Sequence, residues 1–160
     1  MNRLHCALVL VTAFGLTGET HVTTTRVTTH ARGSFEVKLN PQGSDDTVQG
    51  VSIGRTSLEK SFEGDLTGTS EAEMLTAMGS VKGSAVYVAI ERVTGTLDGR
   101  SGTFVLAHRG TMTRGAQDLV ITIVPDSGTG GLAGLAGSMA ITITGGRHLY
   151  DLEYTLSESR

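Results

Sequence analysis

The chain has 160 residues, a formal net charge of -3, 22 Gly, 2 Pro and no Trp. That length is sufficient for one domain with a sizeable core. A negative charge, with only 3 Tyr and 4 Phe, gives no electrostatic or aromatic footprint for nucleic acid. The single Cys6 excludes an internal disulfide framework and a multi-cysteine zinc site.

Residues 1–30 are expected to lie outside the domain. The apolar run from Cys6 to Leu16 follows Arg3; it has the length of a signal-peptide core and is too short to span a bilayer. No clear small-residue cleavage site follows it, and residues 21–30 are polar and repetitive. Two interpretations stay open. The segment is either a leader, which would make the protein secreted, or a flexible, disordered extension of a cytoplasmic protein, the location we expect.

Residues 31–157 are expected to form a single all-β domain, because Val and Thr are frequent and no apolar helical period persists. The expected elements before the middle of the chain are a strand at 34–39, a surface loop at 40–50, a strand within 51–66 with Leu58, Lys60 and Phe62 on one side, and a strand continuing through 71–78. A single helical turn is the alternative for 71–78. Gly64 and Gly68 indicate bulges or bends.

The central stretch, residues 82–112, predicts a long hairpin that turns at Asp98-Gly99. If the turn centres between Gly99 and Arg100, Glu91 lies opposite His108. Opposed residues in an antiparallel pair point to the same face of the sheet. The face expected to turn inward carries Tyr87, Ala89, Glu91, Val93, Phe104, Leu106, His108 and Met112.

The last part of the chain predicts a loop at 114–118, a strand at 119–124, a Gly-rich connection at 125–137 and a second hairpin at 139–156. That hairpin turns at Gly145-Gly146 and pairs Ile141 with Tyr150. Roughly eight strands in sequential hairpins predict an up-and-down barrel or a sandwich. Closure removes exposed edges, and eight strands leave room for side chains or one small ligand.

Five stretches together resemble a bacterial family of domains of unknown function with an allene oxide cyclase-like barrel. They read GSFEVKL (33–39), FEGDLTGTSEAEML (62–75), YVAIERVTGTLDGRSGTFVLAHRGTM (87–112), VPDSGTGGLAGLAG (124–137) and YDLEYTL (150–156). The resemblance implies a closed antiparallel eight-stranded barrel with a cavity. It also implies kinship with allene oxide cyclases and dirigent proteins, which bind small, largely apolar compounds and guide ring closure or coupling without a redox cofactor.

Glu91 and His108 are the candidate catalytic pair. A carboxylate beside an imidazole holds its tautomer and raises its basicity, so the pair would move a proton on a ligand. The alternative is a buried polar pair that satisfies itself and fixes the hairpin register. Both interpretations stay open.

The candidate ligand-binding residues are Tyr87, Val93, Phe104, Leu106, Met112, Tyr150, Tyr154, Glu36 and Glu73. The tyrosines would offer hydroxyl groups, although an aromatic lining is the commoner role for a buried Tyr ring. The position of Glu36 depends on strand parity: if Phe35 and Val37 point inward, Glu36 is solvated. Glu73 is a candidate only because it lies in a stretch that carries the resemblance.

Other chemistry finds little support. Gly128-x-Gly130-x-x-Ala133 loosely fits a dinucleotide fingerprint, but a strand pattern follows it where that fingerprint needs a helix. The histidines show no ligand spacing, and no Gly-x-Ser-x-Gly elbow is present. We therefore expect no metal, no cofactor and no covalent catalysis.

Three functions remain. The first is a barrel that binds a small apolar or amphipathic molecule. The second is a cofactor-independent cyclase or isomerase in which the cavity folds a small apolar substrate. The third is a structural module with a filled barrel. We expect no nucleic-acid or membrane partner, and the oligomeric state stays open, with a homo-oligomer among the alternatives.

Overall fold

The computed structural model describes residues 28–43 and 45–156, so most of the expected leader lies outside the described residues. Nine antiparallel strands form one sheet. The elements are β1 (Thr29–Pro41), β2 (Asp46–Val48), β3 (Val51–Gly64), β4 (Leu66–Met78), β5 (Ala85–Leu97), β6 (Arg100–Thr113), β7 (Ala116–Ile123), the 3-10 turn η1 (Gly130–Leu132), β8 (Leu135–Thr144) and β9 (Arg147–Leu156).

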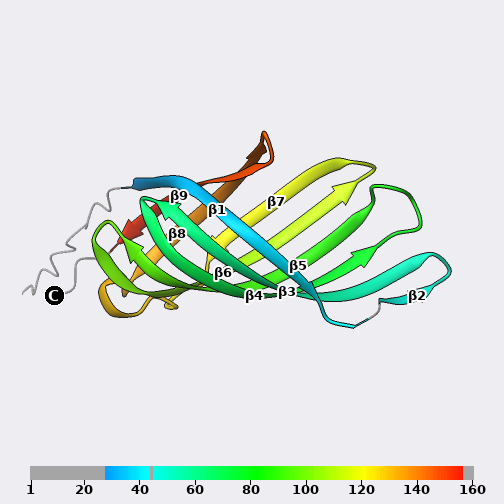
Figure 1. Ribbon diagram of the computed structural model, residues 1–160, viewed down its shortest axis with the longest axis horizontal. Helices are drawn as coiled ribbons and strands as arrows, with labels where there is room; N and C mark the ends of the chain where they lie inside the picture. Colours follow the sequence, from blue (N-terminus) through cyan, green and yellow to red (C-terminus); the bar gives the residue numbers. More distant parts are fainter. Residues whose placement is uncertain (1–27, 44, 157–160) are drawn as a thin grey trace, which may run out of the picture.

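The sheet closes on itself through β1. This strand pairs with β9 on one side and with β3 on the other, so the first and last long strands meet. The short β2 pairs only with the start of β3 and leaves eight strands in the barrel wall (Figure 1). The predicted all-β, closed, antiparallel eight-stranded barrel is confirmed.

Two tight turns fix the main hairpins. Asp98 and Gly99 have φ of 50° and 72°, and Gly145 and Gly146 have φ of 56° and 76°, the positive values that two-residue hairpin turns need. The pairing predicted for the last hairpin, Ile141 with Tyr150, is confirmed.

The register predicted for the central hairpin is wrong by two residues. His108 lies opposite Ala89, not Glu91, because Asp98 and Gly99 occupy both central turn positions and Leu97 pairs with Arg100. A shift of two preserves the inward face, whereas a shift of one would have reversed it. Glu91 and His108 therefore still point into the barrel together, as diagonal neighbours.

Three local predictions, one of a strand and two of loops, are decided or corrected by the observed strand bounds. The stretch 71–78 is a strand, so the helical turn offered as its alternative is wrong. The loop expected at 40–50 contains the short strand β2. The loop expected at 114–118 is reduced to a two-residue turn, because β7 already begins at Ala116.

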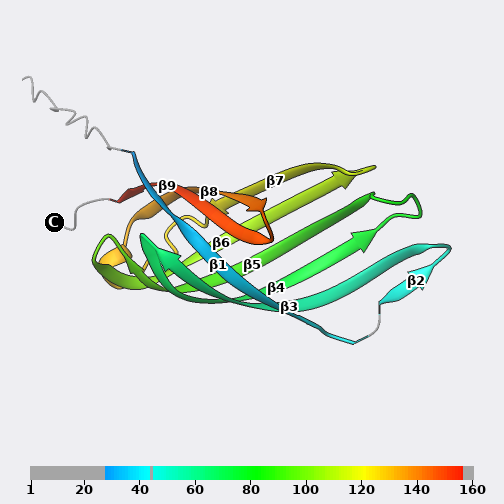
Figure 2. The same ribbon diagram turned by 45° about the horizontal axis from the view of Figure 1, so that its top comes forward.

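One end of the barrel is filled. Figure 2 shows the connection from β7 to β8, with η1, at the same end as the β5–β6 turn. Leu132 of this connection is fully buried, and the backbone N–H of Thr129 donates to the carbonyl of Thr103 over 2.8 Å. The core below this cap includes Leu66, Leu97, Phe104, Leu106, Leu135, Leu152 and Tyr154. We call this end the closed half.

The wall is weakest between β7 and β8. These strands share a single residue pair, Thr122 with Ser138, while each pairs along its length with its other neighbour. From that point the tips of the β6–β7 and β8–β9 hairpins diverge (Figures 1 and 2). The opposite end of the barrel, where the β4–β5, β6–β7 and β8–β9 turns lie, is the open half.

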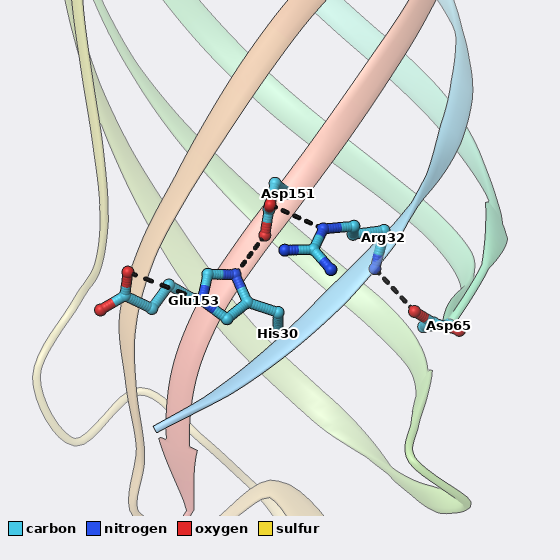
Figure 3. A network of polar contacts seen from close by, with 5 residues as sticks. All are labelled: His30, Arg32, Asp65, Asp151 and Glu153. Atoms are coloured by element: carbon cyan, nitrogen blue, oxygen red, sulfur yellow. Dashed lines mark hydrogen bonds and ion pairs between the residues drawn. The ribbon is translucent and has the colours of Figure 1, made fainter. Parts of the chain in front are cut away.

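The outer surface reinforces the closure between β1 and β9 (Figure 3). Asp151 accepts from Nε of Arg32 at 2.8 Å, and its other oxygen lies 2.6 Å from Nδ1 of His30. The backbone N–H of Arg32 donates to Asp65 in the β3–β4 turn at 2.8 Å. The hydrogen bonds of His30 and then Arg32 lower the pKa of Asp151. These exposed contacts tie β1 to β9 and to the β3–β4 turn, and they face away from the interior.

Candidate functional site: a cavity with a charged floor

The open half contains a cavity of about 410 Å³. Its volume falls in the range of small-molecule sites, which are mostly apolar with a few placed polar groups. The apolar lining includes Phe35, Val37, Leu58, Ala72, Met74, Ala89, Met112, Leu119 and Ile141, and the polar groups at its inner end are Lys60, Glu91 and His108. The site is therefore an apolar cavity whose inner end is formed by Lys60, Glu91 and His108, which we call the floor.

Glu91 is the centre of that floor and is 0% exposed. Its Oε2 accepts from Nζ of Lys60 at 2.6 Å, and its Oε1 accepts from the hydroxyl of Ser70 at 2.5 Å. Lys60 and Ser70 lie opposite each other on β3 and β4, and Glu91 reaches them from β5. Three adjacent strands thus converge on one carboxylate.

His108 completes the floor from β6. Its Nε2 lies 2.8 Å from Oε2 of Glu91, and the residue is 8% exposed. This buried nitrogen makes a close electrostatic contact with the carboxylate without a hydrogen bond of good geometry. A buried polar atom left in this state is uncommon in folded proteins.

Glu91 is held as a carboxylate. Burial alone would raise the pKa of Glu91, but the contacts with His108, Lys60 and Ser70 outweigh burial and lower it to about 2. At neutral pH the negative charge of Glu91 therefore lies directly against the Lys60 ammonium group. Pairing of this kind is what allows a charge to be buried at all.

Aromatic rings line one side of the floor. The Lys60 ammonium lies 4.8 Å from the centroid of the Phe35 ring, a cation–π distance. The ring of His148 stacks on the same Phe35 at 5.1 Å. Across the cavity, the Tyr87 ring lies against Gly110, where any Cβ would overlap it. Burial, and secondarily the charge of Glu91, raises the pKa of Tyr87, so its hydroxyl keeps its proton.

The structure divides the predicted site residues into three groups, of which the first two point into the barrel. Glu91, His108, Tyr87 and Met112 line the cavity. Val93, Phe104, Leu106, Tyr150 and Tyr154 point inward as expected but belong to the packed core of the closed half, which corrects their assignment to the ligand site. The physical reason is that side chains fill the barrel from Val93 and Leu106 to its closed end. Only inward residues on the open side of Glu91 and His108 border the cavity.

Tyr150 has a structural role. Its hydroxyl accepts from the backbone N–H of Leu66 at 2.9 Å and lies 3.2 Å from the carbonyl of the same residue. The ring meets Phe62 edge to face at 5.7 Å. Tyr150 therefore anchors the β3–β4 turn to the core and has no hydroxyl free for a ligand.

Glu36 and Glu73 are corrected to the outer surface. Glu36 alternates with the inward-facing Phe35 and Val37 and is exposed. Glu73 is exposed and accepts from Nε of Arg55 at 3.0 Å. Strand parity places both carboxylates outside the wall, away from the cavity.

Sequence reasoning missed Lys60 and Ser70 as site residues. The signal for Lys60 was present: it alternates with Leu58 and Phe62 on the side that turns inward, a position where a lysine needs a buried partner. Ser70 carried no signal of its own. It contributes because β4 places it opposite Lys60 and next to Glu91 in the barrel.

Two searches of the described residues bear on other kinds of site. Within 28–43 and 45–156, no three His, Cys, Asp or Glu side chains gather closely enough to hold a metal ion. In the same part of the chain, no helix has the length and apolar character for a membrane crossing.

The fold and the site define an eight-stranded antiparallel barrel with one filled half and one half hollowed above a buried ion cluster. The chain belongs to the family described as protein of unknown function DUF3224, which matches residues 31–154. It is similar to a protein with unknown function from Shewanella oneidensis MR-1, a member of the same family whose crystal structure is known. The identity is 48% over 82% of this chain and 99% of that chain, with a TM-score of 0.77. No curated protein matches the chain.

Proposed function

We propose that the barrel binds a small, largely apolar molecule in the cavity of its open half. The single observation that supports this most is the combination of volume and lining: about 410 Å³ lined mainly by apolar side chains, above a floor where polar groups converge. Apolar walls around a space of this size, which water can enter, gain free energy when the apolar surface of a ligand replaces that water. A structural module with a filled barrel is hard to reconcile with it.

The rim of the cavity supports the same proposal. Leu39 and Ile143 follow the inward alternation of their strands, yet they are 55% and 65% exposed. Met78, also inward and exposed, lies at the end of β4. Apolar side chains that face inward and remain wet gain favourable burial when an apolar molecule enters, at about 25 cal/mol per Å².

A neutral fluorescent probe tests this function. N-phenyl-1-naphthylamine should bind with one site per chain and gain fluorescence in the cavity. Ala89→Trp would fill the space beside His108 and should abolish binding, while Ala107→Trp, on the outer face of β6, should leave it unchanged. Circular dichroism shows whether both variants fold. Equal binding by the two folded variants would place the probe outside the cavity and contradict the proposal.

A second candidate function is a cofactor-independent isomerase or cyclase, as the resemblance to allene oxide cyclases and dirigent proteins implies. The 2.8 Å contact between an ionised Glu91 and the His108 ring favours it, because a carboxylate in this position stabilises an imidazolium that has taken a proton. The test is exchange of the α-protons of undecan-2-one in D₂O, followed by NMR. Exchange that depends on His108 supports proton transfer; binding without exchange leaves only the first function.

A further inference from the structure

We infer that the molecule held in the cavity is amphipathic with an uncharged head, a hydroxyl or carbonyl group, which lies at the floor against His108 or Tyr87. Its apolar body, about ten carbons long, would extend to the rim. This inference rests on the proposed binding function and names the chemical class of its ligand.

The charges of the floor are already matched. Glu91 uses Oε2 for Lys60, at 2.6 Å, and Oε1 for Ser70, at 2.5 Å. The Lys60 ammonium lies between that carboxylate and the face of Phe35. One positive and one negative charge therefore cancel inside the floor, and neither calls for a counter-ion from a ligand.

A charged head group would disturb this balance. An anion at the floor would lie beside the buried carboxylate of Glu91, and a cation would lie beside the Lys60 ammonium, in each case within apolar walls. Uncompensated charge in such surroundings costs several kcal/mol, far more than an unpaired neutral group.

Neutral groups are available to bind an uncharged head. With Nε2 of His108 turned to Glu91, Nδ1 is the ring nitrogen left for a ligand. The Tyr87 hydroxyl, which lines the same cavity, keeps its proton and both donates and accepts. In a neutral His108 ring with the proton on Nε2, Nδ1 accepts from a hydroxyl head, while a carbonyl head accepts from the Tyr87 hydroxyl. Neither head group changes the charge of the floor.

The length of the apolar body follows from the strands. Along β6, the lining runs from His108 at the floor to Met112 near the rim, four residues or roughly 13 Å of strand. A chain of about ten carbons spans that distance. Ile141, Met74 and Leu119 would lie along it from β8, β4 and β7.

The experiment compares three probes that differ only in the head group: undecanol, undecan-2-one and undecanoate, each displacing N-phenyl-1-naphthylamine at neutral pH. We expect the two neutral probes to bind about tenfold tighter than undecanoate or better. His108→Ala should weaken undecanol, whose hydroxyl donates to Nδ1, and leave undecan-2-one and undecanoate little changed. His108→Gln should restore part of the affinity for undecanol, and Glu36→Gln on the outer face should change nothing.

Each outcome is informative. Undecanoate binding as tightly as the neutral probes, or losing its affinity in Lys60→Met, would overturn the uncharged head group. If all three probes bind with equal affinity and His108→Ala changes none of them, the floor does not bind the head group and the inference is wrong. If the naphthylamine probe itself fails to bind, the binding function falls and this inference falls with it, a result distinct from the other two.

Discussion

The two halves of the barrel are built from the same strands and differ in the size of the residues that point inward. In the closed half the inward positions carry Leu66, Leu97 and Phe104, which meet in a packed core. In the open half the corresponding positions on β4, β5 and β6 carry Ala72, Ala89 and Gly110, and the cavity occupies the room they leave. The small side chains at these positions leave room in the open half, where β7 and β8 also diverge.

The ion cluster lies at the boundary between the halves. Glu91 and His108 separate Leu106 and Val93, which are fully buried, from Tyr87 and Met112, which line the cavity. A buried ion cluster is a poor source of stability compared with apolar packing. Its position at the floor of a cavity fits the proposed ligand-binding role, and the following changes test how differently the two halves respond.

The largest expected effect is in the closed half. Phe104→Ala removes a fully buried ring from the core and should cost about 3–5 kcal/mol of unfolding free energy. Met112→Ala, at a wall that already borders open space, should cost less than about 1.5 kcal/mol. Urea unfolding of both variants measures the difference. Similar losses would mean that the open half is packed as well as the closed half.

The next effect falls on the floor. Glu91→Gln keeps the shape of the side chain but leaves the Lys60 ammonium, which is 8% exposed, without its counter-charge, so we expect a loss of about 3–5 kcal/mol. Glu73→Gln, which breaks the exposed pair with Arg55, is the matched control and should change stability little, because solvent screens that pair. A mild effect at Glu91 would show that the cluster is open to water.

The pH dependence of stability follows from the same carboxylate. The pKa of Glu91 in the folded protein is lowered from 4.5 to about 2, so its contribution is complete above about pH 4.5 and is lost as the pH falls toward 2. The loss should amount to about 3 kcal/mol in the wild type. Glu91→Gln should lack this component of the acid limb. If the unfolding free energies of the two proteins fall in parallel as the pH is lowered, the pKa of Glu91 is normal.

A smaller effect is expected at Tyr150. Tyr150→Phe removes the hydroxyl that accepts from the N–H of Leu66 and leaves that buried group unpaired, at a cost of about 1–3 kcal/mol. Probe binding in the open half should be unchanged, because the hydroxyl serves the closed half. A loss of binding without a loss of stability would mean that Tyr150 belongs to the ligand site after all.

The sequence could predict which side chains of the site point into the barrel, because that depends only on the alternation along each strand. The alternation around Glu91 and His108 placed both side chains inside, and it survived a two-residue register error because such a shift keeps the face. The same alternation fixed the outward position of Glu36 once Phe35 was known to be buried.

Contacts between strands that are not neighbours in the sequence could not be predicted from the alternation within each strand. The pairing of β1 with β3 brings Phe35 near Lys60, and nothing local in either strand encodes it. The height of the floor also depends on side-chain volumes from several strands at once. For that reason Val93, Phe104 and Leu106 were expected in the cavity but lie in the core below it.

Backbone amide shift mapping tests the central claim most directly, namely that the open half is a binding vessel floored by the ion cluster. On addition of undecanol, the account predicts shifts centred on Tyr87, His108 and Ile141, with the outer-face residues Leu75 and Ile90 unmoved. Shifts centred on Leu75 and Ile90, with His108 silent, would contradict it.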